Sequence, residues 1–243
     1  MDHAHPAAVV LRPLRSYLNP EVGGDPVLLR NIGRHLAAGR LVVVRDALRP
    51  AFADRVHACL DASADWQLHE DYGHSHFHYH HHNLYDERRF PAELRWCVEV
   101  LRSAETRQFV QSLAGRDCSG HGQFSASWYR PGDYSLPHSD LVGAGTRENR
   151  EVAMVWHLTR DWRPGWGGDF YWCPALRYIA PTFNTLLLFT VRRDSVHFVT
   201  AVAPHAQGKR LAVNGWWTGS GDARGGRDRP PGAHALSHLV EVV

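Results

Sequence analysis

The sequence has few of the features that mark disulfide-rich, zinc-binding or membrane proteins. Its four cysteines, Cys59, Cys97, Cys118 and Cys173, form no Cys-x-x-Cys pair, which argues against a zinc site and against a disulfide framework. No apolar run reaches the length of a membrane span, and the apolar stretch near the N-terminus is too short for a signal peptide. These absences favour a cytoplasmic location and predict no membrane partner.

A run of basic residues is also absent. The formal net charge of +2 is too mild to indicate a nucleic-acid partner, and no internal repeat indicates a solenoid. What is present is the balance of a globular protein with a core, 44% hydrophobic and 21% charged residues. A length of 243 residues suits one large domain, for which an all-β barrel or sandwich is an ordinary size.

The first half of the chain predicts a helical layer over about residues 26–114. Residues 26–38 have apolar side chains at helical spacing, with Asp25 as the N-cap and Gly39 as the stop. Residues 41–44 form a β-branched run that suits a buried strand, and residues 50–66 and 91–113 predict two further helices.

The second half predicts strands, which make the fold mainly β. Short β-branched or aromatic runs cover residues 124–129, 152–158, 169–172, 185–191, 197–202 and 211–217. Gly, Pro or Asp residues separate them, a pattern typical of an antiparallel barrel or jelly roll with its core at about 122–218. The Gly-, Arg- and Pro-rich end predicts a mobile tail over residues 221–243.

The β half contains a candidate metal site. His138 and Asp140 are two residues apart, so on an extended segment both side chains project from one face. His197, at the start of another predicted strand, offers a second imidazole. Two His and one carboxylate leave one face of an octahedral metal open, as in Fe(II) oxygenases. The pair alone is weak, since a chain with 18 His supplies chance pairs and a polar loop after Pro137 also explains it.

Arg210 follows His197 by thirteen residues, on the next predicted strand. A buried Arg beside a metal can bind a carboxylate through two parallel hydrogen bonds, whereas an isolated Arg more often pairs with an acidic neighbour. Lys209 should point to the other face. Gly167 and Gly168 permit a tight turn or bulge before a strand.

In this order the motifs resemble the prolyl-hydroxylase branch of the 2-oxoglutarate and Fe(II)-dependent oxygenases, over about residues 123–218. The resemblance is closest to the ribosomal-protein prolyl hydroxylase type, and it implies a double-stranded β-helix, a cupin-like jelly roll, in a single oxygenase domain over residues 1–220. The residues that carry it are His138, Asp140, Trp156-His157-Leu158, Asp161-Trp162, Gly167-Gly168, His197, Arg210 and Gly215-Trp216.

The resemblance also implies the cofactors and the reaction. His138, Asp140 and His197 would bind Fe(II), and Arg210 would bind the C5 carboxylate of 2-oxoglutarate. Decarboxylation of 2-oxoglutarate to succinate would be coupled to hydroxylation of an aliphatic C–H, with ascorbate as a reductant that maintains activity. Asp140 favours hydroxylation over halogenation, because related halogenases lack this carboxylate.

Four more positions carry expectations from the resemblance. Tyr129 matches a tyrosine that lines the cosubstrate pocket, with a core aromatic as the alternative. His157 stands where relatives often have a Tyr, so it either donates to 2-oxoglutarate or fills the barrel. Arg150 and Trp172 are candidate substrate contacts, with a solvated charge and a core aromatic as their alternatives.

A histidine-rich segment, residues 74–82, precedes the third predicted helix. In an extended segment, His74, His76, His78, His80 and His82 share one face. A separate metal site is one interpretation, although no cysteine partner or helical His pair supports it. We favour a lid or exposed loop at the active-site mouth, where Tyr72, Phe77, Tyr79 and Tyr85 would offer binding surface.

Three functions fit these features. The first is hydroxylation of a prolyl or other amino-acid residue in a peptide or protein, and the second is hydroxylation of a free or carrier-bound amino acid or a small metabolite. The third is a non-catalytic cupin-like metal-binding module, which would lack a ligand or the Arg; here all four residues are present.

Overall fold

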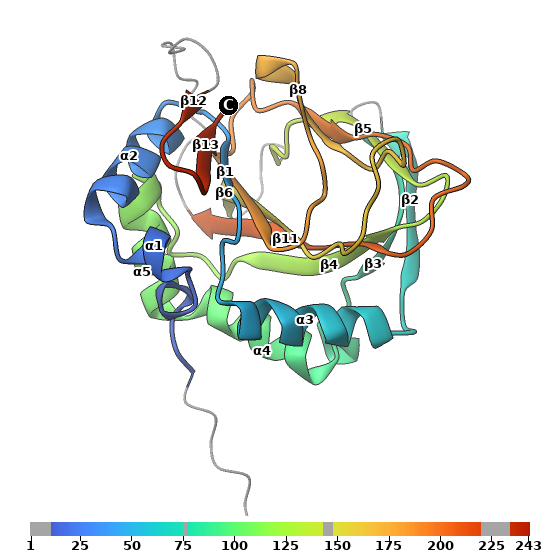
Figure 1. Cartoon of the computed structure of the whole chain (residues 1–243), viewed down its shortest axis with the longest axis horizontal. Coiled ribbons are helices and arrows are strands. Elements are labelled where there is room, and N and C mark those ends of the chain that lie inside the picture. The colour runs from blue at the N-terminus through green and yellow to red at the C-terminus, as the bar shows by residue number, and fades with distance from the viewer. Residues whose placement is uncertain (1–10, 75–76, 143–147, 220–233) are drawn as a thin grey trace, which may run out of the picture.

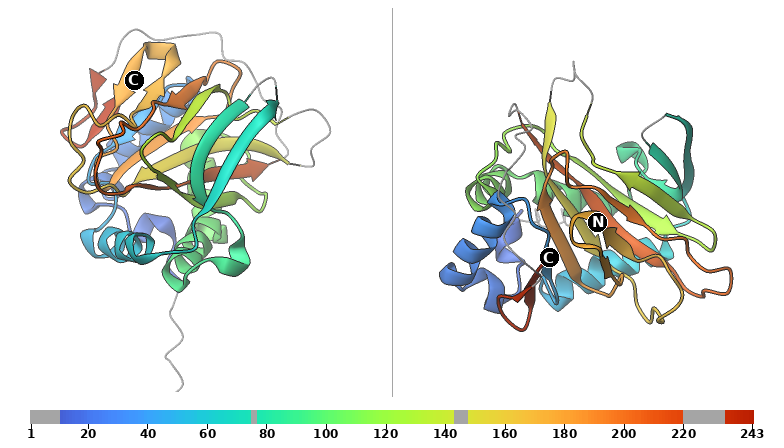
Figure 2. Two further views of the ribbon diagram at one scale, coloured as in Figure 1. Left: turned by 90° about the vertical axis from the view of Figure 1, so that its right-hand side faces the viewer. Right: turned by 90° about the horizontal axis from the view of Figure 1, so that it is seen from above.

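The computed structural model describes residues 11–74, 77–142, 148–219 and 234–243. Within these ranges the fold is mainly β, with helices along one side (Figures 1 and 2), which confirms the predicted class. The helices are η1 (Leu14–Ser16), α1 (Pro20–Gly23), α2 (Pro26–Ala37), α3 (Pro50–Ala62), η2 (Glu87–Arg89), α4 (Ala92–Arg102), α5 (Ala104–Ala114) and η3 (Cys173–Ala175). None of the helices in the described ranges is long and apolar enough to cross a bilayer.

The strands pair in one antiparallel sheet. They are β1 (Val42–Val44), β2 (Gln67–His74), β3 (Phe77–Leu84), β4 (Gln123–Tyr129), β5 (Tyr134–His138), β6 (Asn149–His157), β7 (Phe170–Trp172), β8 (Arg177–Ile179), β9 (Thr185–Thr190), β10 (His197–Val199), β11 (Arg210–Gly219), β12 (His234–Ala235) and β13 (Val240–Val242). Their order is β12-β13-β1-β9-β6-β11-β4-β3-β5-β10-β7-β8, with β2 paired to β3. The sheet curls so that β7 packs against β9, where the rings of Trp172 and Phe189 lie 4.9 Å apart.

The N-terminal helices form where the sequence supplies caps and apolar faces. The Asp25 carboxylate accepts hydrogen bonds from the backbone N–H of Val27 and Leu28, which satisfies donors that the first turn of α2 leaves free. Leu28 and Ile32 face the core. The predicted helix over residues 26–38 is therefore confirmed to within a residue.

The single helix predicted over residues 91–113 is wrong, because two helices meet there. Ser103 ends α4 in an extended conformation (ψ 147°), and its hydroxyl caps α5 by accepting from the Thr106 N–H at 3.2 Å. Apolar periodicity continues across the break, which is why the pattern reads as one helix. A serine competes for backbone hydrogen bonds and favours a cap over a helix interior.

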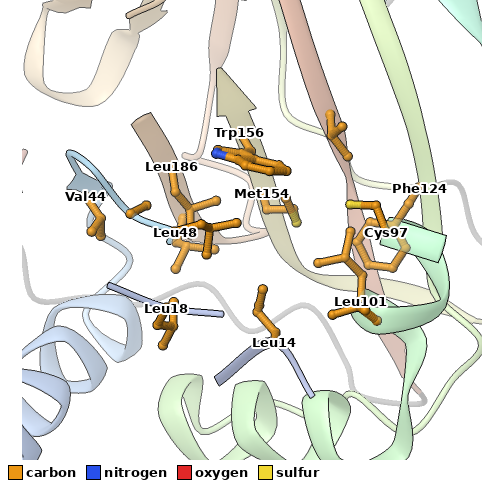
Figure 3. Packing of buried hydrophobic residues seen from close by; sticks show 14 of the residues in the cluster. Leu14, Leu18, Val44, Leu48, Cys97, Leu101, Phe124, Met154, Trp156 and Leu186 are labelled. Carbon is orange, nitrogen blue, oxygen red and sulfur yellow. The ribbon is translucent and has the colours of Figure 1, made fainter. Parts of the chain in front are cut away.

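The central strands are buried on both faces. On β9, Leu186 and Leu188 face the helices, whereas Leu187 and Phe189 face the interior of the curled sheet. This explains the continuous apolar run of β9, since helices cover one face and β7 the other. The helix-side core joins both halves of the chain, and Figure 3 shows Leu14 and Leu101 gathered with Met154 and Trp156.

The C-terminal segment corrects the predicted mobile tail over residues 221–243 where the structure describes it. Residues 220–233 lie outside the described residues. Residues 240–242 form β13, which pairs with β1 so that Val242 lies opposite Val42, and Val240 and Val242 are buried. The Gly-, Arg- and Pro-rich composition of the preceding residues predicts a tail, so the short apolar strand after them was not predicted.

Candidate active site

The three predicted metal ligands lie together in the described structure. His138 is the last residue of β5 and His197 the first of β10, and the two are direct partners in the antiparallel pairing of these strands. The His138 Nε2 lies 3.5 Å from Asp140 Oδ1, and the His197 Nε2 lies 3.5 Å from Asp140 Oδ2. The three ligand atoms lie within 4.8 Å of one another, and no other such cluster of three occurs in the described ranges. Two imidazoles and a carboxylate fit a divalent iron.

Backbone carbonyls orient both imidazoles. The His138 Nδ1 lies 2.7 Å from the Leu136 carbonyl oxygen, and the His197 Nδ1 lies 2.9 Å from that of Ser195. A carbonyl accepts only from a protonated nitrogen, so Nδ1 carries the hydrogen and the Nε2 lone pair is left for a metal. Each carbonyl comes from two residues earlier in the chain, Leu136 within β5 and Ser195 in the segment just before β10.

Asp140 reaches this position through an uncommon backbone conformation. Its φ is 57°, in the left-handed region, which Asp tolerates better than most residues. The side chain is buried. Burial alone raises the pKa of a carboxyl, but attraction by His197 and His138 outweighs it, and the pKa of Asp140 is lowered. Asp140 is therefore ionised at neutral pH, as a metal ligand must be.

Arg210 begins β11 and is 1% exposed. Its Nε donates to the Gly168 carbonyl at 3.0 Å, and its guanidinium carbon lies 4.6 Å from the centre of the Tyr129 ring. Burial lowers the pKa of Arg210 to about 10, which leaves the group charged. Its Nη2 is buried without a hydrogen-bond partner. A buried cation with a free N–H suits a carboxylate, as the distal end of 2-oxoglutarate requires.

The Gly pair before β7 makes room for this arginine. Gly168 has a φ of 69°, and a Cβ on it would lie 3.3 Å from the Arg210 Cγ. Lys209 points the other way, as predicted, with its Nζ 3.5 Å from a carboxylate oxygen of Asp61. Because side chains alternate along a strand, Arg210 points into the interior of the curled sheet and Lys209 points to its outer face.

One cavity of about 360 Å³ connects the triad with Arg210. Residues of β2, β3, β4, β5, β6, β7, β9, β10 and β11 line it, together with Asp140. The donor set at one place and an unpartnered guanidinium nitrogen at another fit Fe(II) and a dicarboxylate in the same space.

The other two predicted cofactor residues differ in position. Tyr129 lines the cavity under Arg210, and its pKa is raised by burial. His157 is fully buried but does not line the cavity. Both of its ring nitrogens lack a partner, and its pKa is lowered by burial and by Arg210. His157 therefore remains neutral, and its contact with 2-oxoglutarate stays a prediction.

The two predicted substrate contacts also differ. Arg150 lines the cavity, with its guanidinium 3.6 Å from the centre of the Trp216 ring and its Nη1 3.4 Å from the Asp140 carbonyl oxygen. Trp172 does not line the cavity. It is 1% exposed and stacks in the interior core at 6.3 Å from the His197 ring. Trp172 packs on Phe189 of β9 and beside His197, whereas Phe170 of the same strand lines the cavity, so a contact of Trp172 with substrate stays a prediction.

The sequence pattern pointed to the wrong histidines of the hairpin as the ones that share the functional face. It grouped the even-numbered His, but His69, Tyr79, His81, Asn83 and Tyr85 line the cavity. The alternation Tyr79-His81-Asn83-Tyr85 along β3 was the available signal. The expectation of a binding surface at the mouth holds for Tyr79 and Tyr85, whereas the side chains of residues 72–78 lie outside the description.

The even-numbered His80 and His82 form no metal cluster with the described residues. The His80 Nδ1 lies 2.6 Å from Glu70 Oε1, and the His82 Nδ1 lies 2.9 Å from Asp133 Oδ2. The Arg130 Nη1 lies 3.3 Å from the His82 Nε2, where a cation would be repelled. These contacts fasten the outer face of β3 to the turn before β5.

Comparisons with known proteins match this geometry. Residues 124–218 match the 2OG-Fe(II) oxygenase superfamily. The chain is 33% identical to the prolyl 3-hydroxylase sudestada1 of Drosophila melanogaster over 39% of this chain and 19% of that protein. It is 29% identical to the prolyl 3-hydroxylase OGFOD1 of Xenopus laevis over 51% of this chain and 25% of that protein. The matches thus span a quarter or less of those relatives' lengths.

Solved structures share the fold. A prolyl-4-hydroxylase of Pseudomonas putida superposes with a TM-score of 0.57 at 17% identity, covering 78% of this chain and 98% of that one. This likeness confirms the predicted double-stranded β-helix and at this identity says nothing of the substrate.

Proposed function

We propose that this chain, which carries a prolyl-hydroxylase-like 2-oxoglutarate and Fe(II)-dependent oxygenase domain, is a dioxygenase that hydroxylates an aliphatic C–H of a prolyl residue in a peptide or protein. The observation that carries the proposal is the cavity that holds both the triad and the unpartnered Nη2 of Arg210. A metal-binding module without activity has no need of the second feature.

Each residue has a defined part in this assignment. His138, Asp140 and His197 would hold Fe(II) and leave the opposite face open. Arg210, kept in place by the Gly168 carbonyl, would bind the distal carboxylate of 2-oxoglutarate. When bound, Fe(II) and 2-oxoglutarate supply the oxidation, in which one atom of O₂ enters succinate and the other the substrate C–H. Asp140 and His197 are buried, whereas His138 is partly exposed in the cavity, through which substrate would reach the iron.

A prolyl substrate is favoured over a free or carrier-bound amino acid by the relatives, both of which are called prolyl 3-hydroxylases. The cavity wall supports this choice, since Tyr79, Tyr85 and Trp216 offer flat apolar faces to a prolyl ring. Arg150, beside Trp216 and the Asp140 carbonyl, is the candidate for a contact with the peptide backbone.

Two measurements test the proposal. Anaerobic addition of 2-oxoglutarate to the Fe(II)-loaded protein should produce a metal-to-ligand charge-transfer band, and its absence would refute the cosubstrate assignment. Succinate release should then be measured with prolyl peptides, the same peptides with Ala in place of Pro, and free proline. Turnover with prolyl peptides alone supports the proposal, and turnover with free amino acids alone contradicts it.

We also propose that the protein works in the cytoplasm. All four cysteines are free, and Cys97 and Cys118 are buried, as suits a reducing compartment. Cell fractionation with an antibody to the native protein tests this.

A further inference from the structure

Four side chains form a row across neighbouring strands at the Arg210 end of the cavity. Arg210 of β11 is paired with Tyr129 of β4, and the pairing of His82 with Trp128 places His81 of β3 beside Tyr129 on the other side. His69 of β2 is paired with His81 in turn. The His81 ring stacks on the Tyr129 ring at 4.7 Å with an angle of 6°, so Tyr129 lies between an imidazole and a guanidinium.

The position of His81 along β3 sets it apart from the metal ligands. Tyr79 lies opposite Ser135 of β5, and His80 lies opposite Tyr134. Because the two strands are antiparallel, His81 lies level with the start of β5, away from His138 at its end. His81 therefore lies at the level of Tyr129 and Arg210, where the distal end of a cosubstrate chelated at the triad would lie.

His81 keeps a buried nitrogen without a partner. Its Nδ1 is one of the described buried polar atoms that make no hydrogen bond, as is the Arg210 Nη2 across the Tyr129 ring. Leaving such an atom unpaired is unfavourable, so a buried nitrogen of this kind points to a ligand that pairs with it. His81 and Arg210, the residues that carry these two nitrogens, both line one cavity.

The other ring nitrogen of His81, Nε2, has a hydrogen-bond partner in the Asn83 side chain. In the favoured orientation of the Asn83 amide, its nitrogen lies 3.2 Å and its oxygen 3.1 Å from the His81 Nε2. The amide nitrogen also lies 3.2 Å from the Ala126 carbonyl oxygen and 3.1 Å from that of His82, so it has three acceptors for two hydrogens, and Asn83 can pair with either tautomer of the ring. When Nε2 accepts from the amide, Nδ1 carries the hydrogen and is a donor.

Burial and the nearby His69 and Arg210 lower the pKa of His81 to about 3. At neutral pH the ring is uncharged, and it offers a single N–H without adding a second charge beside Arg210. A neutral donor next to a guanidinium is a common way to complete the hydrogen bonds of a carboxylate, which has about four acceptor sites.

We propose that His81 is a cosubstrate-binding residue, whose Nδ1–H donates a hydrogen bond to the distal carboxylate of 2-oxoglutarate that Arg210 also binds. The proposal rests on the proposed function. It assigns a role to the histidine-rich hairpin: the odd-numbered His81 faces the cosubstrate, while His80 and His82 fasten the hairpin from outside.

The test measures 2-oxoglutarate binding by the charge-transfer band of the anaerobic Fe(II) protein, without turnover. His81→Phe keeps a ring that stacks on Tyr129 and removes the N–H, and we expect its Kd for 2-oxoglutarate to rise about tenfold, the effect of one hydrogen bond to a charged group. His81→Asn, whose amide N–H lies near the position of Nδ1, should recover most of the affinity. His80→Phe, on the other face of β3, is the matched control and should bind as the wild type does.

A second ligand separates a contact from a structural effect. 2-Oxopentanoate has the same chain length and the same chelating end but no distal carboxylate, so His81→Phe should bind it as well as the wild type does. Equal 2-oxoglutarate affinity in wild type and His81→Phe would overturn the proposal, as would an equal loss for both ligands. If the wild type gives no band at all, it is the proposed function that fails.

Discussion

Asp140 combines two demands at one position, a carboxylate aimed at two imidazoles and a left-handed backbone with φ of 57°. A β-branched or bulky residue would be strained there, whereas Asp and Asn adopt this region more readily. Under the proposed assignment the residue would serve both the turn after β5 and the metal.

The first prediction separates these two demands. Asp140→Asn keeps the backbone preference and the size but removes the ligand charge, and Asp140→Ala removes both. We expect both variants to lose substrate-coupled succinate formation and tight Fe(II) binding, measured by succinate assay and by iron content after dialysis. Asp194→Ala, at an exposed carboxylate, is the control. Full activity in either Asp140 variant would contradict the ligand assignment.

The sequence predicted the charged residues of the site better than its aromatic ones. His138, Asp140, His197 and Arg210 are identified by the order of the motifs and the resemblance that they carry, whereas the extended segment expected for His138 and Asp140 ends at His138, and Asp140 follows with a left-handed backbone. Trp172 could not be placed in this way, since alternation gives a face but not what covers it. His81 was missed because it is the single odd-numbered histidine of the tract, and the run of even-numbered histidines drew the prediction to the other face of the strand.

At the scale of elements, the Gly167-Gly168 turn positions Arg210. Gly167 has a φ of 67°, and a Cβ on it would lie 2.1 Å from the Ala201 carbonyl oxygen. Gly165 has a φ of 85°, but no atom lies within 4 Å of the place where its Cβ would be. The two glycines thus share the backbone conformation and differ in the space around them.

The second prediction uses this contrast. Gly165→Ala should lower the free energy of unfolding by about 1 kcal/mol, the cost of a left-handed alanine. Gly167→Ala should cost roughly 3 kcal/mol or more, because the backbone must also move away from Ala201. It should weaken 2-oxoglutarate binding as well, since Gly168 holds Arg210. Urea denaturation measures the loss of stability, and the charge-transfer titration measures the loss of 2-oxoglutarate binding. Equal stabilities of Gly165→Ala and Gly167→Ala would show that the backbone relieves the close contact with Ala201 without cost.

The strand β13 was not predicted, because the composition of the residues before it is that of a tail. Val242 is fully buried and paired with Val42, whereas Glu241 between the two buried valines reaches Arg45 and Arg177 at 3.3 and 3.2 Å. Exposed ion pairs of this kind contribute little, so the strand is held by its apolar face.

The third prediction follows from that face. Val242→Ala should lower the free energy of unfolding by about 2 kcal/mol, from lost apolar burial and the cavity left behind. Glu241→Ala should cost less than about 1 kcal/mol. Thermal and urea denaturation of the two variants provide the measurement. A larger loss for Glu241→Ala would mean that the ion pairs hold β13.

At the scale of the whole molecule, the buried His157 and the half-buried His81 are two of the histidines that tie the stability of the metal-free protein to pH. Burial lowers the pKa of His81 to about 3 and that of His157 well below its ordinary value. In the unfolded chain both rings titrate near the ordinary value of about 6.5. Below that pH the unfolded state binds protons that the folded state does not, so stability is fully present above about pH 6.5 and is lost as the pH falls.

The fourth prediction is the resulting pH profile. The unfolding temperature of the metal-free protein should fall between pH 7.5 and pH 5, and the fall should be shallower in His81→Phe, which has one titrating ring fewer. Calorimetry across this range measures both. A variant whose profile parallels that of the wild type would show that His81 is not kept neutral by the fold.

The pairing of β5 with β10 has a consequence for the empty and loaded forms of the protein. Only two residue pairs join these strands, His138 with His197 and Ser135 with Val199, with an irregularity between them. Under the proposed assignment both residues of the first pair would hold the ion, so iron would link two strands that few backbone pairs join. By linkage, iron that binds only the paired arrangement stabilises the pairing of β5 with β10 against opening, and the more so the tighter it binds. Loss of iron would then weaken this pairing.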